Sequence, residues 1–257
     1  MEPGRQIADY ADSFTTGTAL EGPLKRTYCF RGIYNTRMMR MPQPENIKSD
    51  LQPYFRRIHA LFSPEFSTVV ADVSLFISQT VRDGFETAFA QLPVHGKVKS
   101  GGPFIEVAEA IVECHLRFVR QSERDIVRKS LLEAYTQFAG PQYILEPVSK
   151  TRLVGSLRRS GSNRKFITTL LSLHLFNLIC IGFQDELRAR MPKVKSFNLY
   201  MSGVETVCRD AVAAAAKRQT GNIDEKWAKA VAKNIEAQLL HSPVRPRNAL
   251  SVRRSTV

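Results

Sequence analysis

The sequence lacks the short motifs by which many nucleotide-dependent and metal-dependent enzymes are recognised. Neither G-x-x-x-x-G-K followed by Ser or Thr nor G-x-G-x-x-G occurs, which excludes phosphate binding by those glycine loops. The five histidines have no cysteine or acidic residue at zinc-ligand spacing. No nucleophile stands beside a general base in a recognisable pattern. We therefore predict no catalytic residue, no metal site and no cofactor, and we expect a protein that is not an enzyme.

Cysteine is scarce as well, with four residues in a chain of 257. A small secreted domain held together by disulfides is much richer in cysteine, so the sequence does not indicate a disulfide framework. Residues 1–14 include acidic side chains and no apolar run, which is unlike a secretory signal peptide. These absences predict reduced thiols in a cytoplasmic or nuclear protein that is not secreted.

Acidic residues are absent from three long stretches, at 22–44, 147–184 and 237–257. These stretches hold five, six and four Lys or Arg residues, respectively. The rest of the chain carries 22 Lys or Arg against 24 Asp or Glu, so the three stretches account for the whole net charge of +13. A charge so far from zero indicates a polyanionic partner, either nucleic acid or an anionic membrane surface.

The first acid-free stretch mixes basic and aromatic side chains. Its candidate binding residues are Lys25, Arg26, Tyr28, Phe30, Arg31 and Tyr34. Cations in such a pattern follow phosphates while the rings stack on bases, which is typical of single-stranded nucleic-acid binding. The alternative is an arm whose rings dock on a neighbouring subunit or on the chain's own body. The two interpretations are compatible, because one arm can do both.

The second stretch lies where the two halves of the chain are expected to meet. Its cations are Lys150, Arg152, Arg158, Arg159, Arg164 and Lys165. A cleft lined by these side chains would hold a phosphate backbone, and the alternative is a solvated loop that is merely basic. The third stretch is a tail whose cations add non-specific affinity for polyanions. The tail ends in Ser255, Thr256 and Val257, a short pattern of the kind that PDZ domains bind.

Apolar residues recur with helical spacing over most of the chain, whereas strand patterns are weak and few. We predict an all-α fold of about seven to eight helices, in two lobes around one buried apolar helix. The expected segments are an N-terminal arm at 1–45, an N-terminal helical lobe at 46–140, a basic connector at 141–163, a C-terminal helical lobe at 164–240 and a disordered basic tail at 241–257.

The central apolar helix is expected at residues 166–183, which contain no Asp, Glu, Lys or Arg. Eighteen residues is about the shortest length that spans a membrane. However, polar residues such as Thr168, His174 and Asn177 lie within the run, and each would need a partner in lipid. A helix buried on all sides explains the run more simply, and His174 is then a core histidine.

Local signals predict several helix ends. Ser63 and Pro64 fit the N-cap and the first position of a helix, and Gly84 is expected to bend that helix. The residues expected to cap further helices are Asp50, Ser122 with Asp125, Ser202 with Glu205, and Asn222.

Three carboxylates, Glu106, Glu109 and Glu113, lie on one face of a helix predicted to begin at Pro103. Paired carboxylates occur in acid–base catalysis. Glu113 also precedes Arg117 by four residues, which is typical of an ion pair on a solvated helix face. We interpret this face as solvated.

Together these features favour a non-enzymatic structural protein that contacts the phosphate backbone of nucleic acid, RNA in preference to DNA, and self-assembles through its N-terminal arm. A nucleocapsid or coat protein would have this character, although that step is an analogy at the level of fold. The alternative is a helical protein–protein adaptor, or a matrix-type protein whose basic stretches meet acidic lipid head groups.

Overall fold

The computed structural model describes six ranges of the chain, which are 44–58, 61–92, 103–139, 154–158, 163–191 and 193–240. Every regular element in these ranges is helical and none of them contains a strand, so the predicted all-α fold is confirmed. The predicted tail, with Ser255, Thr256 and Val257, lies outside the described residues, as do most of the arm and most of the connector.

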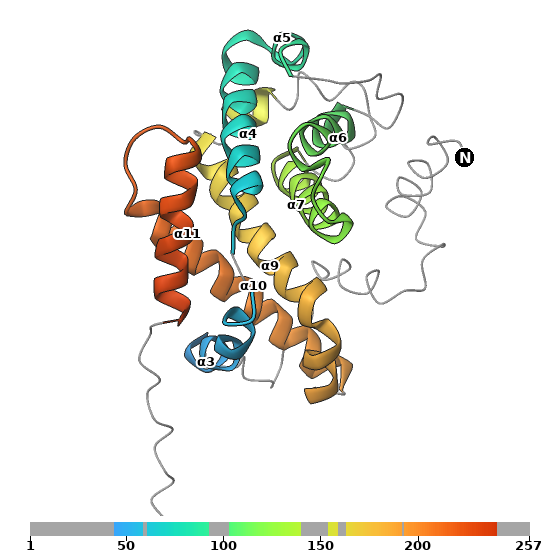
Figure 1. Cartoon of the computed structure of the whole chain (residues 1–257), viewed down its shortest axis with the longest axis vertical. Helices are drawn as coiled ribbons and strands as arrows, with labels where there is room; N and C mark the ends of the chain where they lie inside the picture. Colours follow the sequence, from blue (N-terminus) through green and yellow to red (C-terminus); the bar gives the residue numbers. More distant parts are fainter. Residues whose placement is uncertain are drawn as a thin grey trace, which may run out of the picture.

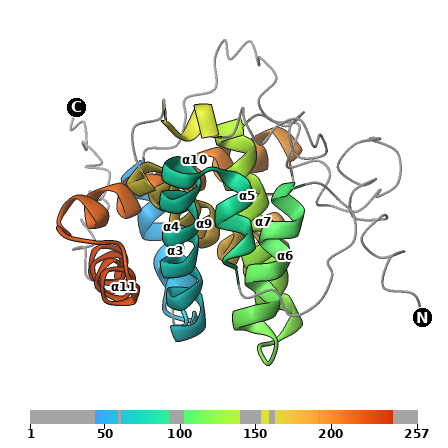
Figure 2. The ribbon, with the colours of Figure 1, turned by 90° about the horizontal axis from the view of Figure 1, so that it is seen from above.

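Eight helices make up the described fold, and a single helical turn at 154–158 precedes α9. Their bounds are α3 Pro44–Phe55, α4 Pro64–Asp83, α5 Phe85–Ala90, α6 Pro103–Leu116, α7 Gln121–Ala139, α9 Asn163–Arg190, α10 Val194–Lys217 and α11 Glu225–Leu240. Helix α9 runs through the middle, in contact with α4, α7 and α10 (Figure 1). The pair α6 and α7 lies on one side of α9, and α11 lies on the other (Figure 2).

Helix α9 is the core helix that its sequence predicts. It is long and apolar enough to cross a membrane, but 67% of its apolar window is buried inside the protein. His174 is buried, and its ring stacks on Phe66 of α4 with the ring centres 3.6 Å apart. Because burial disfavours the charged imidazolium, it lowers the pKa of His174 to about 3. The prediction of a core histidine is confirmed.

Some of the predicted helix ends are confirmed. The Ser63 hydroxyl accepts a 3.1 Å hydrogen bond from the backbone N–H of Phe66, and Pro64 begins α4. Gly84 separates α4 from α5 with a φ of 90°, a conformation that glycine adopts without strain.

The other predicted caps are wrong. Asp50, Ser122 and Ser202 lie inside α3, α7 and α10. In α3 and α10 the buried apolar face begins before the capping signal. In α10, for example, Phe197 and Tyr200 are buried upstream of Ser202. Helix α11 is capped by Asp224 rather than by Asn222, since the Asp224 carboxylate accepts a 2.8 Å hydrogen bond from the backbone N–H of Trp227.

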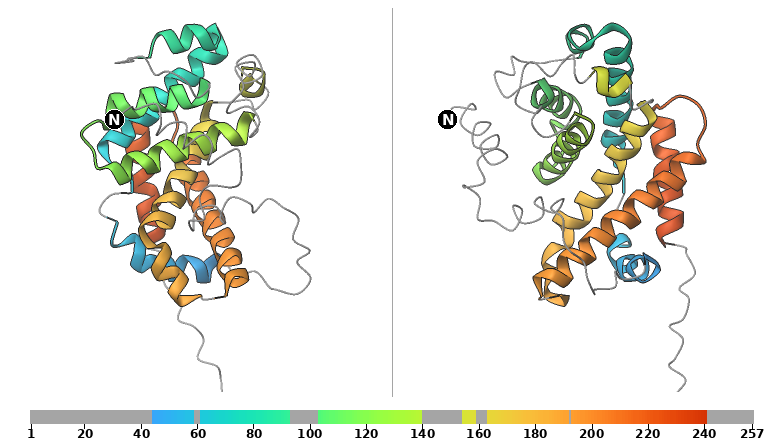
Figure 3. Two further views of the ribbon diagram at one scale, coloured as in Figure 1. Left: turned by 90° about the vertical axis from the view of Figure 1, so that its right-hand side faces the viewer. Right: turned by 180° about the vertical axis from the view of Figure 1, so that it is seen from behind.

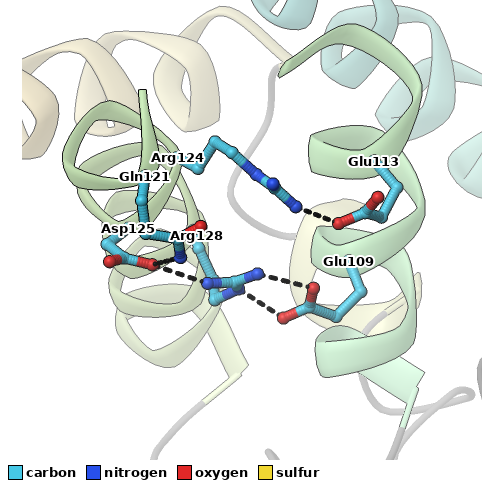
Figure 4. A network of polar contacts seen from close by, with 6 residues as sticks. All are labelled: Glu109, Glu113, Gln121, Arg124, Asp125 and Arg128. Atoms are coloured by element: carbon cyan, nitrogen blue, oxygen red, sulfur yellow. Dashed lines mark hydrogen bonds and ion pairs between the residues drawn. The ribbon is translucent and has the colours of Figure 1, made fainter. Parts of the chain in front are cut away.

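The expectation of a solvated face on α6 is wrong for Glu109. Arg128 of α7 binds the Glu109 carboxylate through two nitrogens, and its Nη2–Oε2 distance is 2.9 Å (Figure 4). Only 14% of the Glu109 side chain and 16% of the Arg128 side chain are exposed. Glu113 pairs with Arg124 of α7 instead of Arg117. Glu109 and Glu113 therefore join α6 to α7, with Glu109 largely shielded from water and the Glu113 side chain 46% exposed.

Packing runs across the division between the two predicted lobes. Helix α3 lies against α10 and α11, α4 lies against α11, and α7 lies against α9. The buried side chains of these helices belong to one hydrophobic core. The lobe boundaries themselves stay a prediction.

Candidate nucleic-acid interface

Three of the twelve predicted binding residues, Arg158, Arg164 and Lys165, lie within the described ranges. The other nine lie outside them and stay predictions. They are Lys25, Arg26, Tyr28, Phe30, Arg31, Tyr34, Lys150, Arg152 and Arg159.

Arg158 is exposed in the helical turn before α9, and its guanidinium is bonded to the backbone. Its Nε and Nη2 atoms donate to the carbonyl oxygen of Val81, at distances of 3.2 Å and 2.9 Å. Val81 lies in the last turn of α4, where carbonyl groups have no partner within their own helix. Arg158 therefore holds the connecting turn against the end of α4.

Arg164, in the first turn of α9, caps the far end of α10 in the same way. Its Nη1 donates to the carbonyl of Gln219 at 2.7 Å, and its Nη2 donates to the carbonyl of Gly221 at 3.1 Å. A longer contact of 3.5 Å reaches the Ala216 carbonyl. The guanidinium carbon also lies 5.7 Å from the centre of the Trp227 ring. A positive charge at this place stabilises both the unpaired carbonyls and the negative end of the helix dipole.

The Arg164 contacts bring the start of α9 beside the turn between α10 and α11 (Figure 3). Lys165, the next residue, is exposed there. Lys217 and Arg218, at the end of α10, are exposed as well. The contact therefore places two cations from the end of α10 near the one predicted from the acid-free stretch.

Helix α11 contributes three further lysines. Lys226, Lys229 and Lys233 have the spacing of one helix face and are exposed, whereas the stripe that begins at Trp227 is buried. The six exposed cations, which we call the α9–α11 basic surface, are Lys165, Lys217, Arg218, Lys226, Lys229 and Lys233.

Two carboxylates lie among these cations. Asp224 caps α11, and Glu225 pairs with Lys229 at 3.2 Å. The surface consequently keeps a large excess of positive charge. Such a surface attracts a phosphate backbone over distances up to about a Debye length, roughly 8 Å at physiological salt.

Five of the six residues of this surface were not predicted, because only Lys165 lies in one of the three stretches without acidic residues. Asp210, Asp224 and Glu225 interrupt the run around α10 and α11. The spacing of Lys226, Lys229 and Lys233 opposite the Trp227 stripe is the signal that could have found half of the surface.

The thiols of Cys114 and Cys180 do not have the lowered pKa of a reactive cysteine. Burial raises the pKa of Cys180 to about 12, and burial together with the Asp72 carboxylate raises the pKa of Cys114. A reactive thiol needs the opposite shift. His115 pairs with Asp72 at 2.6 Å, joining α6 to α4. No group of three His, Cys, Asp or Glu side chains is placed to hold a metal within the described ranges.

Comparisons with protein-family models, with curated proteins and with solved structures found no match for this chain.

Proposed function

We propose that this protein binds the phosphate backbone of nucleic acid, RNA in preference to DNA, and assembles with further copies of itself as a structural, non-enzymatic protein. The observation that supports the binding is the α9–α11 basic surface. Its cations come from three consecutive helices, and Arg164 of α9 bonds to the turn between α10 and α11. Backbone binding needs cations on a firm scaffold and no base-specific group.

Salt dependence of binding tests the proposal. The variant Arg218→Gln/Lys226→Gln removes two exposed cations from the surface. Each lost phosphate contact to a single strand should lower the slope of log affinity against log salt by roughly 0.7, so the pair should lower it by about 1.4. Fluorescence anisotropy with labelled single-stranded RNA, repeated at several salt concentrations, gives the slope.

A matched variant controls for net charge. Arg117→Gln/Arg120→Gln also removes two exposed arginines, from the turn between α6 and α7. Equal slopes for the two variants would contradict binding at the α9–α11 basic surface, since total charge would then decide affinity. A wild-type protein that ignores RNA at low salt but pellets with anionic vesicles would support the matrix-type alternative instead.

Assembly is tested by removing residues 1–43, the part of the predicted arm that precedes α3. Deletion leaves every contact described above in place, because the first helix in the described ranges begins at Pro44. We expect the shortened protein to keep its helical circular dichroism and to elute as a monomer where the full chain elutes as an oligomer. Loss of the helical signal would show instead that the arm is part of the core.

A further inference from the structure

A second group of cations lies at the other end of α9, where the chain turns into α10. Arg190 ends α9, and Val194 begins α10 after three intervening residues. The end of α3 lies against the same place, because Arg57 pairs with Glu186 of α9 at 2.8 Å. The cations at this place, which we call the α9–α10 corner, are Arg56, Arg57, Arg188, Arg190, Lys193 and Lys195.

Three of these arginines lie over aromatic rings. The guanidinium carbon is 4.9 Å from the ring centre for Arg57 over Phe183, 5.4 Å for Arg190 over Tyr54, and 5.4 Å for Arg188 over Phe197. The three rings are buried, so they are not available to stack on bases. Stacking uses the flat face of a guanidinium and leaves the N–H groups at its edge able to donate to phosphate. The corner is therefore suited to a phosphate backbone and not to reading bases.

The corner has a net positive charge, because its six cations outnumber the three carboxylates, Asp50, Asp185 and Glu186, that lie near it among the described residues. Glu186 is engaged by Arg57. Within the described part of the chain, the side chains of Arg188 and Arg190 form no hydrogen bond or ion pair, and the same holds for Lys193 and Lys195. The N–H groups of these four side chains can thus donate to an external anion, although Arg190 also acts electrostatically on Glu186.

The apolar surface at the corner is too small for a membrane site. A protein that lies on a membrane inserts an apolar face between its cations. Val194, with 52% exposure, is the one large exposed hydrophobic residue here among the described residues. The others, Leu75, Phe118 and Ile181, lie on α4, on the α6–α7 turn and further back on α9. A polyanion fits the corner better than a lipid surface does.

We propose that the α9–α10 corner is a second phosphate-binding surface, and that one strand of nucleic acid long enough to reach it contacts both the corner and the α9–α11 basic surface. This inference rests on the proposed function. The two surfaces lie at opposite ends of α9, which has 28 residues and is therefore about 42 Å long at a rise of about 1.5 Å per residue.

The length of the nucleic-acid strand distinguishes binding at one surface from binding at both surfaces. A strand of about 5 nucleotides covers roughly 17 Å at 3.4 Å per nucleotide and reaches one surface, whereas about 24 nucleotides cover roughly 80 Å. When a strand reaches both surfaces, the second contact is intramolecular and raises the affinity beyond the sum of separate sites. We therefore expect the wild-type protein to bind the long strand more tightly than the number of overlapping sites explains.

The variant Lys193→Gln/Lys195→Gln removes two exposed corner cations that have no polar partner among the described residues. It should weaken binding of the long strand by a larger factor than binding of the short one. Its salt slope with the long strand should fall by about 1.4. Arg117→Gln/Arg120→Gln, which loses the same charge elsewhere, should affect both lengths by the same smaller factor.

Three outcomes would overturn the inference, and they are distinguishable. If the corner variant behaves like the control while Arg218→Gln/Lys226→Gln still lowers the slope, the proposed function stands and the second surface does not. If the wild type binds neither strand, both proposals fail. If the corner variant loses binding to phosphatidylserine vesicles but not to RNA, the corner meets a membrane.

Discussion

The guanidinium of Arg164, at the start of α9, donates a 2.7 Å hydrogen bond to the backbone carbonyl of Gln219, just beyond the end of α10. The two residues are 55 positions apart in sequence. This bond and its neighbour at Gly221 join the central helix to the turn that links the other two helices of the α9–α11 basic surface. A residue that we predicted as a phosphate contact is therefore also a structural link between helices.

Replacement of Arg164 should destabilise the fold. Arg164→Met keeps an apolar side chain near Trp227 but leaves the Gln219 and Gly221 carbonyls without this donor. Hydrogen bonds to a charged group contribute about 1.5–3 kcal/mol, so we expect a loss of that size in the free energy of unfolding from urea denaturation. Lys233→Gln, on the exposed face of α11, should change it by less than about 0.5 kcal/mol. Equal stability of the two variants would contradict the structural role.

The ion pair between Glu109 and Arg128 should show strong coupling. Arg128→Met leaves a carboxylate that is 14% exposed without its main cation, and breaking a buried pair in this way costs about 3 kcal/mol or more. The double variant with Glu109→Met removes the uncompensated charge and should regain most of the loss. In the corresponding cycle for Arg124 and Glu113, where Glu113 is 46% exposed, we expect coupling of about 1 kcal/mol or less. Similar coupling in the two cycles would show that burial does not set the strength of these pairs.

His174 should make the protein less stable in mild acid. Its pKa is about 3 in the folded protein and about 6.5 in an unfolded chain, so the unfolded state takes up the proton first as the pH falls. Stability should therefore decline from about pH 6.5 downward, by about 2 kcal/mol at pH 5 from this residue alone. His174→Phe should lack this part of the decline when urea midpoints are compared at pH 7 and pH 5. A variant with the wild-type pH profile would mean that other groups cause it.

Glu133 should give the opposite pH dependence from His174, because it should make the folded protein less stable as the pH rises. Burial raises its pKa above the ordinary value, although Lys129 and the 2.8 Å hydrogen bond from the Asn177 amide partly offset the effect. A raised folded pKa means that stability is complete at low pH and is lost as the pH rises through that pKa. Glu133→Gln, whose side-chain carbonyl can still accept from Asn177, should thus be more stable than wild type near pH 7. The gain should disappear in acid.

The control for this residue is Asp210→Asn, at an exposed carboxyl on α10. It should shift the unfolding midpoint little at any pH. If Glu133→Gln were less stable than wild type at pH 7, the Glu133 carboxylate would be stabilised by its surroundings, contrary to the direction of its pKa shift.

The sequence by itself determined the fold class and the identity of the core helix. Helical spacing of apolar residues specifies which face of each segment is buried, and a run of 18 uncharged residues leaves the middle of α9 without a charged face. A local signal was also sufficient to predict the start of α4 at Ser63 and Pro64, since the N-cap bond there spans only three residues.

Only the tertiary structure decided what the charged residues do. A helical period indicates that a face is covered but not which helix covers it, so the partners of Arg164 and Glu109 do not follow from local spacing. Glu113 pairs with Arg124 across two helices, although Arg117 stands at the preferred spacing of four residues, because α6 ends at Leu116 before reaching Arg117. Capping signals at Asp50 and Ser202 failed for a related reason, because burial of neighbouring apolar side chains outweighs the roughly 1 kcal/mol of a cap. The α9–α11 basic surface exists because packing brings together cations that acidic residues separate in the sequence. At the α9–α10 corner, packing adds Arg56 and Arg57 to four cations that are already close in sequence.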